Sequence, residues 1–161
     1  MDVNTLLAGL DFSRTRLLAL LDTIEKSGQD VSKVLAWRPG PGRAHIAWQA
    51  MHCAATHDRY LNVGLKGGKV NDEALVAAYA GGSTPSDSNI PAMAEIRSAL
   101  ETTYAAFRNH AATLPAAELD RMMPSKRTVG ESLLLMAWHE AHHQGQIHLT
   151  WNLYKQAHGV A

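Results

Sequence analysis

The stretch TVGESLLLMAWHEAHHQGQIH, residues 128–148, contains the clearest helix start in the chain and a pair of histidines one helical turn apart. Thr128 and Glu131 match a capping box, in which each side chain accepts a hydrogen bond from the other residue's backbone N–H. An apolar run follows at once, so we predict a long helix from about 128 to 157. An amphipathic helix of this length must bury its apolar face against other elements.

Three more segments have helical periodicity, and we find no convincing strand. They cover residues 3–27, with Leu6, Leu10, Leu17 and Leu21 on one face, and about 44–61 and 91–114. A connection over about 62–90 separates the middle two and includes a candidate short helix, DEALVAAY. This pattern predicts an all-α four-helix bundle with a long connection between its second and third helices. We assign residues 1–161 to a single domain.

Composition excludes several classes of function. Fifteen basic residues balance fifteen acidic ones, so the formal net charge is zero, which argues against a nucleic-acid partner. No apolar run approaches the roughly 20 residues of a membrane span. Cys53 is the only cysteine and cannot form an internal disulfide; we interpret it as a small buried side chain. We expect a soluble, cytoplasmic protein without a membrane partner.

His139, Glu140 and His143 match H-E-x-x-H, the signature of zinc proteases. Two histidines at i and i+4 share a helix face and can bind one metal ion. A metzincin would need its third histidine at position 149, which is Leu149, and a thermolysin-type glutamate would lie beyond Ala161. A di-iron site would need a second Glu-x-x-His motif, which the sequence lacks. We therefore expect any third ligand to lie upstream and regard a zincin-type protease as disfavoured.

The helix at 44–61 carries a second group of candidate residues. Trp48, His52, Thr56 and Arg59 follow one another at three- and four-residue intervals and share a face. Arg59 is a candidate for holding an anionic group of a substrate. On the last helix, Gln146 follows His143 by almost one turn and is a candidate for orienting a ligand.

The layout resembles the DinB/YfiT-like superfamily of four-helix metalloenzymes. The resemblance rests on WRPGPG at residues 37–42, on His52 within AWQAMHCAATHDRYL, and on H-x-x-x-H followed by QGQI at 139–147. Family members often have arginine where this chain has Gln144. The resemblance implies an up-down-down-up bundle, often a homodimer, and a divalent metal, commonly zinc or nickel. Carried over by position, the metal ligands are His52, His139 and His143.

Members with known activity include S-transferases and maleylpyruvate isomerases that depend on a low-molecular-weight thiol. The resemblance therefore favours a metal-dependent enzyme, either a thiol-dependent transferase or isomerase or a hydrolase, acting on a small molecule. The alternative is a non-catalytic, stress-related helical module that binds a metal or ligand. Glu140 is an uncertain neighbour of the metal site. The roles of the four remaining candidate histidines stay open: His45, His57, His142 and His148.

Overall fold

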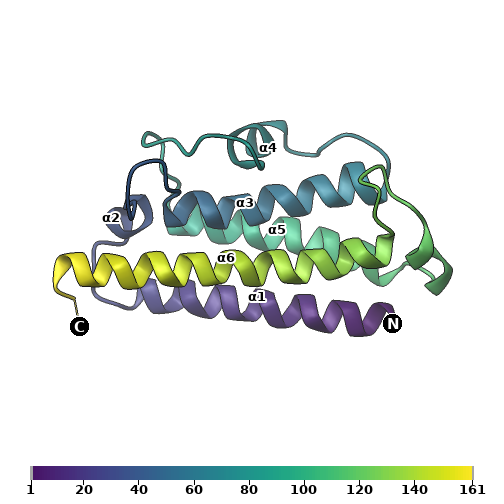
Figure 1. Cartoon of the computed structure of the whole chain (residues 1–161), viewed down its shortest axis with the longest axis horizontal. Coiled ribbons are helices and arrows are strands. Elements are labelled where there is room, and N and C mark those ends of the chain that lie inside the picture. Colours follow the sequence, from purple (N-terminus) through teal and green to yellow (C-terminus); the bar gives the residue numbers. More distant parts are fainter. Residues whose placement is uncertain (1, 161) are drawn as a thin grey trace.

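The computed structural model describes residues 2–160, which are helical apart from turns, loops and one isolated bridge between Met122 and Thr128. Figure 1 shows the long helices α1, α3, α5 and α6 lying side by side, with the short α4 outside α3. The bounds are α1 Val3–Glu25, α2 Val31–Ala36, α3 Ile46–Arg59, α4 Glu73–Tyr79, α5 Met93–Ala112 and α6 Val129–His158. A π-helix, η1 (Tyr60–Leu65), extends α3, and a 3-10 helix, η2 (Ala116–Asp120), precedes α6.

The capping box predicted for the last helix is present. The Thr128 side chain accepts a hydrogen bond from the Glu131 backbone N–H at 3.1 Å, and Glu131 accepts one from the Thr128 N–H at 2.7 Å. The predicted short helix corresponds to α4, which Asp72 caps at Leu75. The other boundaries differ by a few residues. Sequence periodicity does not detect α2, because this helix has only 6 residues. It starts after its N-cap, Asp30.

Two apolar clusters fill the bundle. One cluster includes Leu17, Leu21 and Ile147, and the other includes Leu10 and Phe107 near the opposite end. Among the helix pairs, α1 packs most extensively on α6, and α3 packs on both α5 and α6. The last contact is the important one for function, because it places the histidines of α3 and α6 against each other.

Several large apolar side chains remain exposed on α1 and α6: Phe12, Leu134, Trp138 and Leu149. A homodimer would bury such residues, and the homodimer expected from the sequence stays a prediction. None of the helices in residues 2–160 is both long and apolar enough to cross a membrane.

Candidate metal centre

Three histidines from two helices converge at the α3–α6 contact. His52 comes from the middle of α3, and His139 and His143 come from consecutive turns of α6. Each offers one ring nitrogen, and these three atoms all lie within 4.8 Å of one another. The Nε2 atoms of His52 and His139 are 3.0 Å apart. The structure thus brings together the three residues that the family resemblance singles out.

The ring of His52 is oriented by groups outside the cluster. Its Nδ1 lies 2.6 Å from the backbone carbonyl oxygen of Tyr79, at the end of α4. A carbonyl can only accept a hydrogen bond, so Nδ1 carries the proton and Nε2 keeps its lone pair toward His139. The indole of Trp48 stacks on the imidazole, with ring centroids 4.9 Å apart and planes 7° from parallel. The Trp48 Nε1 donates to Ser83 Oγ at 3.2 Å, which holds the indole in place.

The surroundings keep all three imidazoles neutral at physiological pH. Burial, with a smaller effect of the neighbouring His52, lowers the pKa of His139 to about 4. Burial and the adjacent His139 lower the pKa of His143 to about 3. Burial also lowers the pKa of His52, against the opposing hydrogen bond to Tyr79. Neutral imidazole is the form that binds a metal.

The donor set fits a divalent metal ion. Tetrahedral zinc bonds of about 2.0–2.1 Å place neighbouring nitrogens roughly 3.3 Å apart, close to the separation of the His52 and His139 Nε2 atoms. The Nδ1 of His143 is buried and has no hydrogen-bond partner within residues 2–160. A buried polar atom without a partner is costly, and a metal ion bound at that nitrogen would remove the cost.

The sequence matches the DinB superfamily over residues 10–147, a range that contains all three histidines. The chain belongs to the DinB superfamily. No curated protein gives a significant match to it. The family prediction made from the WRPGPG, His52 and H-x-x-x-H features is therefore confirmed, whereas the superfamily match by itself assigns no reaction to this DinB-superfamily protein.

A small cavity of about 190 Å³ opens beside the histidines of this DinB-superfamily protein. His52 and His139 form part of its wall, and Thr56 and Arg59 of α3 continue it. Tyr60, Gly81 and Leu135 also line it. Among the residues predicted from the sequence, Trp48 packs on the ring of His52. Thr56 and Arg59 line the cavity beside the histidines.

Gln146 and Glu140 do not line this cavity. The Gln146 amide is 2.8 Å from Nε2 of His142, an exposed residue that stacks on Trp138. Gln146 therefore contacts His142, which stands outside the cluster, and it also interacts with His143, where its hydrogen bonding opposes the lowering of the pKa. His45 serves as the N-cap of α3: its Nδ1 accepts a hydrogen bond from the Trp48 N–H at 3.0 Å.

Glu140 belongs to a polar layer inside the bundle, formed by the buried Arg14, His57 and Glu140 and the half-buried Tyr104, with one residue from each long helix. Arg14 Nε donates to Glu140 Oε2 at 3.2 Å, and Arg14 Nη2 donates to Oε1. The Arg14 guanidinium also lies 4.4 Å from the centre of the Tyr104 ring. His57 Nδ1 is 3.8 Å from Glu140 Oε1. Glu140 therefore faces α1, away from the histidine cluster.

The polar layer contains strongly perturbed groups. Burial raises the pKa of Glu140 to about 7, and the Arg14 guanidinium opposes that shift. Burial, together with Arg14, lowers the pKa of His57 well below its ordinary value. Arg14 and Tyr104 were not among the site residues predicted from the sequence. The sequence does contain one indication of this layer: Arg14 is a charged residue within the apolar face of the first helix, between Leu10 and Leu17.

The lowered pKa values predict how the metal-free protein responds to acid. Between pH 6.5 and about 4, the unfolded chain binds a proton at position 139 that the folded chain does not bind. The contribution of this histidine to stability must therefore fall as pH falls through this window. Each such histidine contributes a slope of about 1.4 kcal/mol per pH unit. Urea unfolding of the metal-free protein between pH 6.5 and 4.5 measures the slope.

Glu140 acts in the opposite direction, because its folded pKa is raised. A His139→Gln variant isolates the histidine, since it keeps Glu140 and removes one titrating ring. We expect its stability to decline less steeply with acid than that of the unsubstituted chain, by about 1.4 kcal/mol per pH unit. Equal slopes in the two proteins would contradict the assignment.

Proposed function

We propose that the protein is a metal-dependent enzyme with one divalent ion, zinc or nickel, bound by His52, His139 and His143. The observation that carries this proposal is the convergence of three ring nitrogens within 4.8 Å at the wall of a cavity. We further propose that the reaction is thiol-dependent transfer or isomerisation of a small molecule, as in superfamily members with known activity. The long connection between α3 and α5 supports an up-down-down-up order of the four long helices.

Three neutral nitrogen ligands leave coordination positions open, which is typical of catalytic rather than structural zinc. When bound there, the ion would lower the pKa of a coordinated thiol or water and supply a nucleophile near neutral pH. The chain's own residues set the geometry. The Tyr79 carbonyl fixes the protonated nitrogen of His52, and Trp48 covers the ring face. Because His139 and His143 are four residues apart, they lie on the same face of α6.

The cavity beside the proposed ligands supports a catalytic rather than a structural role for the metal ion. Its wall includes His52 and His139 themselves, so a molecule in the cavity would be adjacent to the bound ion. Thr56 offers a hydroxyl on the same wall. A metal that only linked α3 to α6 would need no such space.

Elemental analysis of purified protein tests the metal site. We expect about one zinc or nickel per chain, and less than a tenth of that in His52→Ala, because two imidazoles on one helix bind a divalent ion far more weakly than three. His142→Ala is the matched control, since it removes a neighbouring histidine that lies outside the cluster. Full metal content in His52→Ala would overturn the proposed ligand set.

The open coordination positions need a separate test. In the cobalt-substituted protein, an added low-molecular-weight thiol should change the visible absorption spectrum if it binds the metal directly. The same addition to the His142→Ala control should produce the same change. A spectrum that stays constant with thiols and with small anions would overturn the catalytic site and favour a closed structural one.

A further inference from the structure

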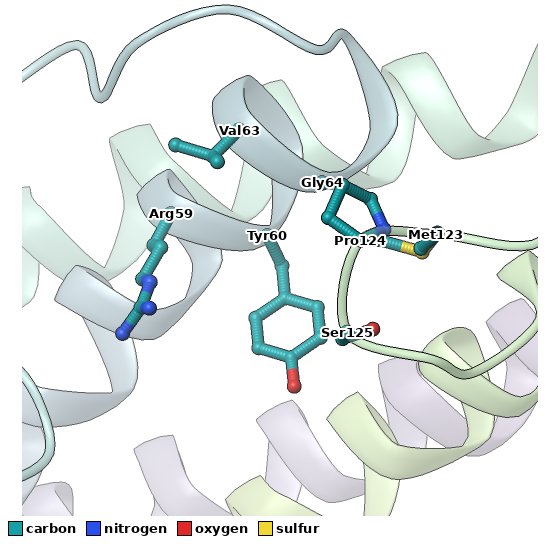
Figure 2. Close-up of a pocket in the computed structure, with 7 residues that line it drawn as sticks. All are labelled: Arg59, Tyr60, Val63, Gly64, Met123, Pro124 and Ser125. Carbon is teal, nitrogen blue, oxygen red and sulfur yellow. The ribbon is translucent and has the colours of Figure 1, made fainter.

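A second cavity adjoins the one beside the histidines. It has a volume of about 320 Å³ and lies between the α3–η1 segment and the loop that precedes α6 (Figure 2). Arg59 and Tyr60 line both cavities. Figure 2 shows these two side chains extending from the junction of α3 and η1. The combined volume falls within the range of small-molecule sites, roughly 300–1,000 Å³.

The shared wall between the cavities is cationic. Arg59 is exposed and, within residues 2–160, forms neither an ion pair nor a side-chain hydrogen bond. The linings of the two cavities, as the structure describes them, contain no aspartate or glutamate. A guanidinium without an acidic partner favours an anion, and its planar fork suits a carboxylate that accepts two hydrogen bonds.

The second cavity is mostly apolar beyond Arg59. Val63 and Gly64 come from η1, and Met123 and Pro124 come from the facing loop. The loop approaches η1 closely, because a Cβ built on Gly64 would lie 2.3 Å from the Met123 methyl carbon. The wide π-helical turn that presents Tyr60, Val63 and Gly64 is a feature often found at functional sites. Met123 provides a flexible thioether wall that adapts to different apolar groups.

We propose that the two cavities form one binding site for a carboxylic acid with an apolar body. The carboxylate binds Arg59, the apolar body enters the cavity between η1 and the 122–126 loop, and the reactive group lies near the carboxylate, beside His52 and His139. This substrate class rests on the proposed function only for the placement of the reactive group. Binding of the acid itself requires Arg59 and the second cavity, and it does not require the metal.

Straight-chain carboxylates serve as probes for the full-length protein, in metal-free and zinc-loaded forms. Titration calorimetry should show affinity rising from butyrate to octanoate, roughly three- to fourfold for each methylene that enters the cavity. Hexanamide, which has the same shape without the charge, should bind at least roughly tenfold more weakly than hexanoate. Methyl NMR should locate the apolar end through a shift of the Met123 signal, while Met93, which lines neither cavity, stays unchanged.

Arg59→Gln should weaken hexanoate binding roughly tenfold or more in the metal-free protein. Arg43→Gln is the matched control, because Arg43 is also exposed and lines neither cavity. Gly64→Ala should reduce the gain from longer chains, since its methyl group competes with the Met123 side chain for space. The NMR location of the probe is decisive even if that variant folds poorly.

The outcomes separate the two proposals. Hexanoate that binds the metal-free protein through Arg59, without any zinc binding, would overturn the metal centre and leave this site standing. Zinc binding with no carboxylate affinity, or with affinity indifferent to Arg59 and to chain length, would overturn this site. Carboxylate binding seen only in the zinc-loaded form would also overturn it, because the metal alone would then hold the anion.

Discussion

Arg14→Leu is expected to lower the free energy of unfolding by about 3–5 kcal/mol at pH 7. Arg14 and Glu140 are both buried, with side-chain exposures of 5% and 0%. Removing the guanidinium leaves the Glu140 carboxyl in the bundle interior without its charged partner, and desolvation raises its pKa further. The loss should grow as pH rises above 7, because the carboxyl must then either ionise without its partner or stay protonated against the rising pH. Urea unfolding of the metal-free protein at pH 7 and at pH 8.5 measures both effects.

Two comparisons give this prediction its controls. Arg14→Leu combined with Glu140→Leu should recover much of the lost stability, since apolar replacement of a whole buried pair is often neutral. Lys33→Met removes one partner of the exposed Lys33–Asp30 pair and should cost less than about 1 kcal/mol. If Arg14→Leu costs no more than Lys33→Met, the buried pair contributes little and the prediction is wrong.

Removal of the metal should produce the second large effect. A ligand that binds only the folded chain stabilises it by about 2.7 kcal/mol when its free concentration is 100 times Kd. For a domain of this size that corresponds to about 5–11 °C in Tm. We therefore expect an excess of chelator to lower the Tm of zinc-loaded protein by that amount, in a calorimetric scan at pH 7.

The histidine variants show whether the effect comes from the proposed site. In His139→Ala the Tm should be the same with and without chelator, because the ligand set is broken. In His142→Ala, which removes an exposed ring outside the cluster, the chelator should still lower the Tm as in the unsubstituted protein. A chelator effect that survives in His139→Ala would place the metal elsewhere on the protein.

Local sequence signals predicted the helical fold well. The capping box at Thr128 and Glu131 marks the start of α6, and the spacing of Leu6, Leu10, Leu17 and Leu21 defines the buried face of α1. The boundaries were less accurate, because caps depend on single side chains. His45 delays the start of α3 by capping it, and Glu95 fixes the start of α5 by accepting the Ala92 N–H. Neither was recognised from periodicity.

The functional site was predicted in part. The four-residue spacing places His139 and His143 on one face of any helix, and only the identity of the upstream partner needed the family resemblance. Glu140 was predicted only to be a neighbour of the metal site, and in the structure it contacts Arg14 of α1. Gln146 was a candidate for orienting a ligand; its side chain contacts His142 and interacts with His143, and its orienting role stays a prediction. The Tyr79 carbonyl could not be predicted, since main-chain atoms have no sequence signature.

The sequence by itself determined the four long helices, the pairing of His139 with His143 and the family, because all three depend on residues close together in the chain or on short motifs. The tertiary structure decided which groups meet across the bundle. The packing of α3 on α6 brings His52 to the histidine pair, and the packing of α1 on α6 brings Arg14 to Glu140. Such contacts depend on how helices far apart in sequence pack their side chains, and helical periodicity identifies the buried face of each helix without specifying its partner.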